Sequence, residues 1–323
     1  MALIRDLIVQ GAQMLLVVLL APLVTGLVRK VKARLTRRRG PPLMQPYRDL
    51  LRLVHKATVL AENASWLFRA APYLIFAATW VAAALVPTFA TGLLFNWTAD
   101  LIAIVALLGS ARFFQALAGM DVGTSFGGIG ASREMMIASL AEPAMIMIVF
   151  SLALLVGSTQ LSAIAAFMMS PNVGLRVTLG LALVSLIIVG IAENARVPVD
   201  NPATHLELTM VHEAMVLEYS GRHLALIELS ASLKLLLYLS LIACLFLPWG
   251  MVPVRPALSI DTLEAYALGG GAYILKLGFG CVMLAFFETS IAKMRVFRVP
   301  TFLGTALMLG LLGALLLFVS RGL

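Results

Sequence analysis

Long apolar runs separated by short polar segments fill the whole chain. Eight of these runs have the length of a membrane-spanning helix, at 7–28, 70–89, 101–118, 135–156, 173–191, 224–247, 263–287 and 302–319. A helix needs about 20 apolar residues to cross roughly 30 Å of hydrocarbon, and the short alternating segments of a membrane barrel are absent from the sequence. The pattern predicts an all-α polytopic membrane protein with about eight transmembrane helices, which form a single membrane domain over 1–323.

Composition agrees with this prediction and adds an orientation. Apolar residues make up 61% of the chain and charged residues only 12%. Of the 24 Lys and Arg residues, 18 fall in or beside the first, third, fifth and seventh loops, and such residues are retained in cytoplasmic loops. We therefore expect both termini outside. The net charge of +8 then orients the chain on the lipid bilayer, which gives little reason to expect a nucleic-acid partner.

The sequence offers no cofactor site of its own. Cys244 and Cys281 lie singly within predicted spans, without the spacing that holds zinc or an iron–sulfur cluster. The four histidines fall in or beside loops, so the facing intramembrane pairs that ligate a haem are missing. The glycines at 127, 128 and 130 lack the pattern of a phosphate-binding loop and indicate a flexible or closely packed turn. We expect no metal, no cofactor and no catalytic residue in this chain.

A few ionisable residues lie within or near the predicted spans, where an apolar residue would have a lower free-energy cost. Glu142 lies about two turns into the fourth span, and Glu134, eight residues earlier, shares its helical face. Lys234 lies well inside the sixth span. Glu142 is either half of a structural ion pair, with Arg133 or Lys234, or a proton-relay carboxyl. Glu288, near the end of its span, is expected to extend to the membrane surface instead.

Two loops carry most of the remaining polar residues. The basic loop at 29–69 contains an amphipathic segment, 47–56, with Arg48, Arg52 and Lys56 along one edge of a helix. This helix either touches anionic lipid or docks a cytoplasmic partner. The acidic loop at 192–223 begins ENARVPVDNPATHLEL, in which two prolines prevent the preceding span from continuing.

Several short motifs together resemble one family. The chain is similar over nearly its whole length to membrane subunit 1 of complex I, a family that also supplies the corresponding subunit of energy-converting membrane-bound nickel–iron hydrogenases, such as formate hydrogenlyase and the carbon-monoxide-induced hydrogenase. The resemblance rests on Arg38-Arg39-Gly40-Pro41, Gln45-Pro46, Asp49-Leu50-Leu51, Gly130-Ala131-Ser132-Arg133 with Glu142, Arg196-Val197-Pro198 with Asp200, and Glu218-Tyr219-Ser220-Gly221.

The resemblance implies a non-redox subunit, in the inner membrane of a bacterial or archaeal cell, that anchors a peripheral arm and begins ion movement. On this interpretation the arm contacts Arg38, Arg39, Gln45, Arg48, Asp49 and Arg52. Arg133 and Arg196 would be charged partners of the ion path. Ion translocation, of protons or sodium, is expected at Glu134, Glu142, Glu193, Asp200, Glu207, Glu213, Glu218 and Lys234.

The stretch around Ala203 and His205 favours the hydrogenase branch, because complex I proteins usually have further acids there. The implied partners are the hydrogenase large and small subunits and the iron–sulfur proteins of the arm, which would carry the iron–sulfur clusters and the nickel–iron centre, together with an antiporter-like membrane subunit. One alternative is the quinone-site subunit of a NADH:quinone oxidoreductase. A more distant one is a stand-alone secondary transporter, although the sequence shows no obvious internal repeat.

Overall fold

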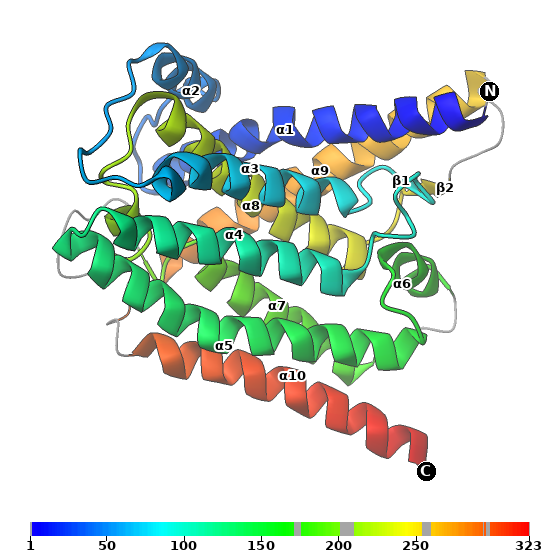
Figure 1. The fold of residues 1–323 in the computed structure, drawn as a ribbon. Helices are drawn as coiled ribbons and strands as arrows, with labels where there is room; N and C mark the ends of the chain where they lie inside the picture. The colour runs from blue at the N-terminus through cyan, green and yellow to red at the C-terminus, as the bar shows by residue number, and fades with distance from the viewer. Residues whose placement is uncertain are drawn as a thin grey trace.

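Eight apolar helices of the described residues lie side by side in one bundle (Figure 1). A computed structural model describes residues 2–170, 176–200, 210–253, 260–292, 294 and 298–322. The eight are α1 (Ala2–Leu35), α3 (Trp66–Leu85), α4 (Leu101–Asp121), α5 (Ser125–Val156), α7 (Val177–Glu193), α8 (Gly221–Phe246), α9 (Ile260–Ser290) and α10 (Val299–Gly322). Seven are long and apolar enough to span a membrane, and α7 is shorter but also apolar. The predicted polytopic all-α fold is confirmed.

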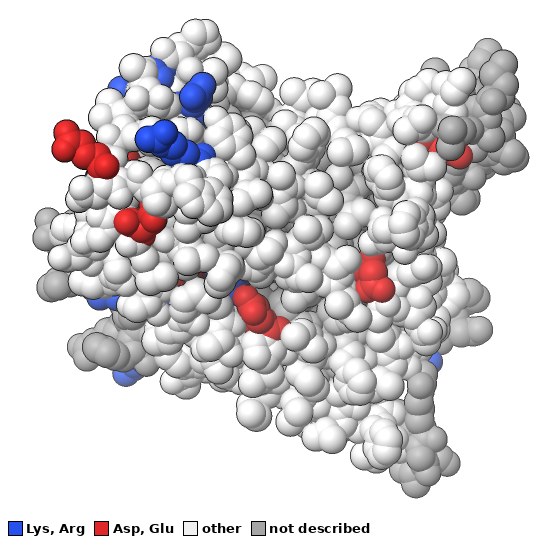
Figure 2. All heavy atoms as spheres, viewed as in Figure 1, with Lys and Arg blue, Asp and Glu red and all other residues white. Residues whose placement is uncertain are grey.

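The two ends of the bundle differ in what they carry. One end holds α2 (Gln45–His55), the turn between α4 and α5, and the 3₁₀ helix η2 (Glu213–Met215); we call it the loop end (Figure 1). The other holds both termini, the short helix α6 (Leu161–Met168), and the two-residue strands β1 (Ala90–Thr91) and β2 (Val252–Pro253), which pair in parallel. Figure 2 shows most of the visible Lys and Arg side chains gathered at the loop end, and few charges between the ends.

Helix boundaries follow from local capping. The side chain of Ser65 accepts a hydrogen bond from Leu67 N at the start of α3, and Asp100 accepts one from Ile102 N at the start of α4. Such caps satisfy backbone donors that the first helical turn leaves free. Gly157 ends α5 in the left-handed conformation, with φ of 80°, a backbone state that glycine adopts without steric cost.

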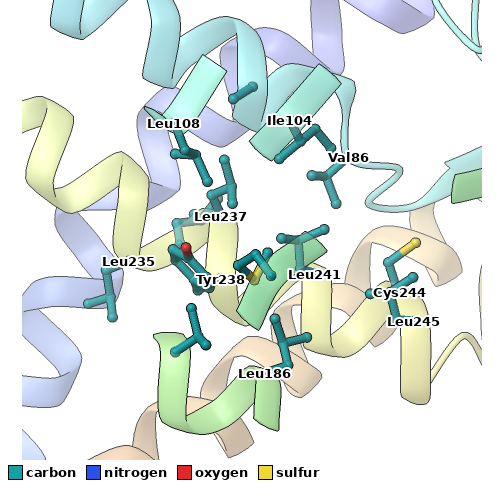
Figure 3. Packing of buried hydrophobic residues seen from close by; sticks show 14 of the residues in the cluster. Val86, Ile104, Leu108, Leu186, Leu235, Leu237, Tyr238, Leu241, Cys244 and Leu245 are labelled. Carbon is teal, nitrogen blue, oxygen red and sulfur yellow. The ribbon is translucent and has the colours of Figure 1, made fainter. Parts of the chain in front are cut away.

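Helix α8 runs through the middle of the core. Its residues Leu237, Tyr238 and Leu241 pack against Leu186 of α7 and Leu108 of α4 (Figure 3). Helices α1, α3 and α9 also contact α8. Because α8 touches helices on several sides, a polar side chain on it faces other protein groups rather than lipid.

The amphipathic segment predicted at 47–56 is helix α2. The Tyr47 hydroxyl donates to the Leu19 carbonyl of α1, and Pro46 is buried. The apolar edge is not fully covered, because Leu51 is 60% exposed and Val54 56% exposed. Both lie at the loop end, where the exposed arginines of the first loop also lie.

Helices α4 and α5 pack closely through glycine. A Cβ atom at Gly127, in the first turn of α5, would overlap the backbone carbonyl oxygen of Gly119 on α4. The run of glycines predicted to form a turn therefore lies within α5, and the prediction of close packing is the part that holds. The neighbouring Gly128 has open space around its Cβ direction.

These two adjacent glycines provide a matched test of the packing. We expect Gly127→Ala to lower the midpoint of thermal unfolding in detergent, because the added methyl group meets rigid backbone and overpacking of this kind costs about 1–3 kcal/mol. Gly128→Ala makes the same chemical change in open space and should leave the midpoint at the parent value or slightly above it. Equal midpoints for the two variants would contradict the observed approach of α4 to α5.

Candidate functional site

A buried arginine lies at the centre of the bundle. Arg112 comes from the middle of α4, and its side chain is only 3% exposed. Its guanidinium faces three carboxylates: Glu134 Oε1 lies 3.4 Å from Nε, Glu142 Oε1 lies 3.5 Å from Nη1, and Glu193 forms an ion pair with Nη2. Glu134 and Glu142 come from α5, and Glu193 ends α7. A planar guanidinium with five N–H donors suits such a site, because it offers donors in several directions at once.

A second cation completes this group. Lys234 Nζ on α8 lies 3.0 Å from Glu193 Oε2, on the opposite side of the carboxylate from Arg112. We call Arg112, Glu134, Glu142, Glu193 and Lys234 the Arg112 cluster. Three carboxylates face two cations in it, so one negative charge lacks a counterpart within the cluster. Carboxylates that share a low-dielectric site do not ionise independently, and the arrangement can therefore bind and release a proton.

Spacing along α5 explains how two carboxylates reach one arginine. Eight residues separate Glu134 from Glu142, which is close to two helical turns and places both on the same face. The Glu134 side chain is 8% exposed, whereas that of Glu142 is 43% exposed. Gly109 of α4 leaves room for Glu142, since a Cβ there would lie 3.4 Å from Glu142 Oε1. The cluster thus extends from the interior to the side of the bundle at Glu142.

A small cavity adjoins the cluster. Its lining includes Arg112, Lys234, Gln115 of α4, Ser230 of α8 and His212, and its volume is about 20 Å³. Gln115 Nε2 lies 3.2 Å from Nδ1 and 3.3 Å from Nε2 of His212. Burial lowers the pKa of His212 below its usual 6.5, while Glu134 and Asp200 oppose this shift and Lys234 and Arg112 reinforce it. The imidazole is therefore neutral near pH 7.

The segment from Met210 to Met215 carries His212 into this position. Arg133 Nη1 donates to the Met210 carbonyl at 2.8 Å, and Asp200 Oδ2 accepts from Val211 N at 3.4 Å. Met215, 2% exposed, packs against Ala116 and Ala131. It also lies beside two glycines, because a Cβ at Gly119 would come within 2.9 Å of Met215 and one at Gly130 within 3.0 Å. Small residues on α4 and α5 thus form a seat for this methionine.

A separate charged group lies closer to the loop end. Glu288 of α9 binds Lys32 of α1 at 2.8 Å and Arg196 at 3.2 Å, and its side chain is 2% exposed. The prediction that Glu288 extends to the membrane surface is wrong, because α1 continues to Leu35 and brings a lysine to the buried carboxylate. This group ties α1, α9 and the segment after α7 together.

Other predicted residues lie outside the Arg112 cluster. Arg133 holds the Met210 carbonyl and Arg196 holds Glu288, so neither pairs with Glu142. Asp200 is buried at the base of the His212 segment, Glu213 is partly buried in η2, and Glu218 is exposed. The predicted Glu207 lies outside the described residues, and so does the stretch around Ala203 and His205. The structure thus brings together Glu134, Glu142, Glu193 and Lys234 from the predicted set.

Sequence reasoning missed the central residue. Arg112 is one of the 18 basic residues that the charge count places in or beside the loops, yet it lies inside α4 and is buried. One signal could have identified it: Arg112 is the only charged residue of the apolar run 101–118, and three small residues precede it. Gln115 and His212 were missed because their contact joins positions 97 residues apart.

The residues expected to meet an arm lie at the loop end. Arg38, Arg39, Arg48 and Arg52 are exposed. Gln45 Nε2 donates to Asp49 Oδ1 at 3.0 Å, and Asp49 also lies 3.4 Å from Arg52. Within the part of the chain that the structure describes, no three His, Cys, Asp or Glu side chains converge as a metal site would require.

Comparisons with known proteins give concordant results. A family described as NADH dehydrogenase matches residues 9–319. Formate hydrogenlyase subunit 4 of Escherichia coli (strain K12) is 32% identical over 293 residues, covering 89% of this chain and 91% of that protein. Hydrogenase-4 component C of the same organism is 37% identical over 240 residues, covering 74% and 75%.

More distant relatives also match most of the chain. NADH-quinone oxidoreductase subunit 8 of Rhodothermus marinus is 27% identical over 260 residues, covering 77% of this chain and 74% of that protein. A chain of the archaeal membrane-bound sulfane sulfur reductase, a respiratory membrane complex, has the same fold. Its TM-score is 0.79 at 20% identity, and the match covers 98% of this chain and 99% of that one.

The dependence of the cluster on Arg112 can be measured with a double-mutant cycle. We expect Arg112→Gln to lower the unfolding midpoint sharply, because removing one partner of a buried ion pair costs about 3–5 kcal/mol. Arg112→Gln combined with Glu193→Gln should be less destabilised than the sum of the two single variants, since the second change removes a carboxylate that the first leaves unpaired. Thermal unfolding in detergent provides the measurement.

Arg222→Gln is the matched control, because Arg222 is exposed at the start of α8. It should change the midpoint little, as surface substitutions usually do. Strictly additive effects of the Arg112 and Glu193 substitutions would show that the two side chains do not stabilise each other.

Proposed function

The chain belongs to the NADH dehydrogenase family, and we propose that it is the ion-translocating membrane subunit of a membrane-bound nickel–iron hydrogenase complex related to complex I. In this role it anchors a peripheral arm and couples electron transfer in that arm to the movement of protons or sodium ions. The chain itself carries no redox centre in this proposal. Its relatives in formate hydrogenlyase and hydrogenase-4 support the hydrogenase assignment.

The Arg112 cluster is the observation that carries the proposal. Burying charges is expensive, and replacing a buried ion pair with apolar residues is often neutral or stabilising. A stability role alone therefore explains poorly why four helices each contribute a charged side chain to one point. Charged groups inside a membrane domain commonly mark ion pathways. The excess of carboxylates over cations supplies a site that exchanges a proton, and Glu142 extends the cluster to the side of the bundle.

The electrons would pass through partner subunits. We assign these as the hydrogenase large and small subunits and the iron–sulfur proteins of the arm, with an antiporter-like subunit beside the bundle in the membrane. The arm would contact the loop end, where α2 presents exposed arginines beside Leu51 and Val54. Protein interfaces commonly combine arginine with apolar side chains, which supports a protein partner at this surface.

A second candidate function is the quinone-site subunit of a NADH:quinone oxidoreductase. The 27% identity to subunit 8 of the Rhodothermus marinus enzyme supports it. The two candidates differ in what the assembled complex does, since one evolves hydrogen and the other reduces quinone.

Orientation in the membrane follows from the basic residues at the loop end, which we propose to be cytoplasmic, with both termini outside. Both native cysteines are buried, so an introduced cysteine can be labelled selectively. In intact cells or spheroplasts, a membrane-impermeant maleimide should label a cysteine added after Leu323 and should not label Arg39→Cys. In inverted vesicles the pattern should reverse. Labelling of Arg39→Cys from outside would contradict the proposed orientation.

The function is tested on the complex purified from its own membrane in mild detergent. Nickel–iron and iron–sulfur subunits should co-purify with the chain, and the preparation should evolve hydrogen from reduced methyl viologen. Co-purification with NADH-oxidising subunits and inhibition by quinone-site inhibitors would instead favour the second candidate. A lone, transport-active chain would contradict both.

Ion movement is then measured in proteoliposomes, in sodium-free and sodium-containing buffers. We expect Glu193→Gln to lower the ions moved per hydrogen evolved by about 10²-fold, the usual scale for losing a positioned proton-transfer group. Glu264→Gln makes the same change at an exposed position of α9 and should pump like the parent. Parent-level pumping by Glu193→Gln would remove the Arg112 cluster from the ion path.

A further inference from the structure

The cavity beside the Arg112 cluster has the size and lining of a water site. Its volume of about 20 Å³ exceeds the roughly 10–15 Å³ that a cavity needs, on this measure, to hold one water molecule. Arg112 Nε and Nη1 are buried without a well-aligned hydrogen bond in the described structure. The lining also offers hydroxyl groups of Thr79 and Ser230, the Gln115 amide and the Lys234 ammonium. A buried water typically makes two to four hydrogen bonds, and this lining can provide them.

His212 stands between this cavity and the outside of the bundle. It belongs to the segment after α7, at the loop end, rather than to any spanning helix. The residue is only partly buried, yet its ring lines the cavity and lies beside Gln115. It is the only histidine in contact with the cavity among the described residues. A loop residue that lines the cavity and is itself only partly buried is placed to connect the cavity with the loop end.

Imidazole chemistry matches that placement. A neutral imidazole has one protonated and one free nitrogen, so it accepts a proton on one edge and releases another from the opposite edge. The groups that face His212 are Glu134 on α5, Arg112 on α4, Lys234 on α8 and Asp200 on its own segment. Burial and the two cations favour the neutral ring, and the two carboxylates stabilise a transient positive charge. A ring held in this balance accepts a proton and does not retain it.

We propose that His212 is the proton-transfer residue at the loop-end mouth of the Arg112 cluster, and that it exchanges protons with Lys234, the ion-pair partner of Glu193, through a water molecule held in the adjoining cavity. In each transfer the free ring nitrogen forms an N–H bond with an incoming proton and the other N–H bond breaks, so the ring returns to its neutral state in the other tautomer. The proton passes to the cavity water, which releases one of its own to the cluster. No oxidant or reductant takes part.

The proposal rests on the proposed function, since a proton path needs an ion-moving complex. It also explains the construction of the Met210–Met215 segment. Arg133 and Asp200 hold its backbone, and the glycine seat fixes Met215, three residues beyond His212. These contacts fix the ring beside the cavity through the backbone and Met215, and the Gln115 amide is the side-chain neighbour of the ring nitrogens.

The test uses the purified complex in proteoliposomes, with hydrogen evolution from reduced methyl viologen and proton movement measured together. His212→Gln and His212→Asn keep a polar side chain but cannot take up a proton near neutral pH. We expect both to assemble, to evolve hydrogen, and to move about 10²-fold fewer protons per hydrogen. His223→Gln is the matched control, because His223 is buried on α8 but lines no part of the cavity; it should pump like the parent.

Chemical rescue separates proton transfer from a structural role. In His212→Ala, added imidazole should restore pumping in a concentration-dependent way, most effectively near its own pKa, whereas a structural defect would not respond. Pumping by His212→Gln at the parent rate, or a loss in His212→Ala that imidazole leaves unchanged, would overturn the proposal. If the parent pumps and Glu193→Gln does not, either of these two outcomes for the His212 variants removes only His212 from the ion path. If the parent complex moves no ions, the proposed function and this inference are both wrong.

Discussion

The buried guanidinium of Arg112 is the interaction on which the rest of the structure depends. Its positive charge lies among the side chains of a bundle interior, where an unpaired charge is very unfavourable. The carboxylates of α5 and α7 make that position tolerable, and Lys234 of α8 offsets part of their negative charge. Each of these four helices contributes at least one charge. The positions of the helices therefore set the distances between the charges, and the pairing of the charges favours those positions.

The close packing of α4 against α5 determines which residues can reach the Arg112 cluster. Glycines at 119, 127 and 130 let α4 and α5 approach each other and let the Met215 side chain settle beside them. The same contact brings a loop residue, His212, to the level of a buried arginine. The Met210–Met215 segment thus becomes part of the interior through the buried side chains of Val211, Ala214 and Met215 and two hydrogen bonds to its backbone.

The sequence predicts those features that depend on periodicity along one helix. The eight spans, the helix at the first loop and the shared face of Glu134 and Glu142 all follow from local spacing. The ion-pair partners of these residues do not follow from local spacing. A count of charged residues by loop does not say how deep a side chain lies in the bundle, and it placed Arg112 with the loop residues. Arg133 lies one residue from Glu134, yet it points to the Met210 carbonyl. Contacts of this kind depend on how helices pack, which local spacing does not encode.

The seat of Met215 has a consequence for handling the molecule. The contact is apolar and fitted by shape, so the screening that dissolved salt imposes on exposed charges does not weaken it. The arginines of α2 are exposed, and interactions through them are weakened by salt. Washing membranes with concentrated salt should therefore release proteins bound through those arginines while the His212 segment stays folded against the bundle. The two parts of the loop end therefore respond differently to salt, which weakens contacts through the α2 arginines and leaves the packing of Met215 unchanged.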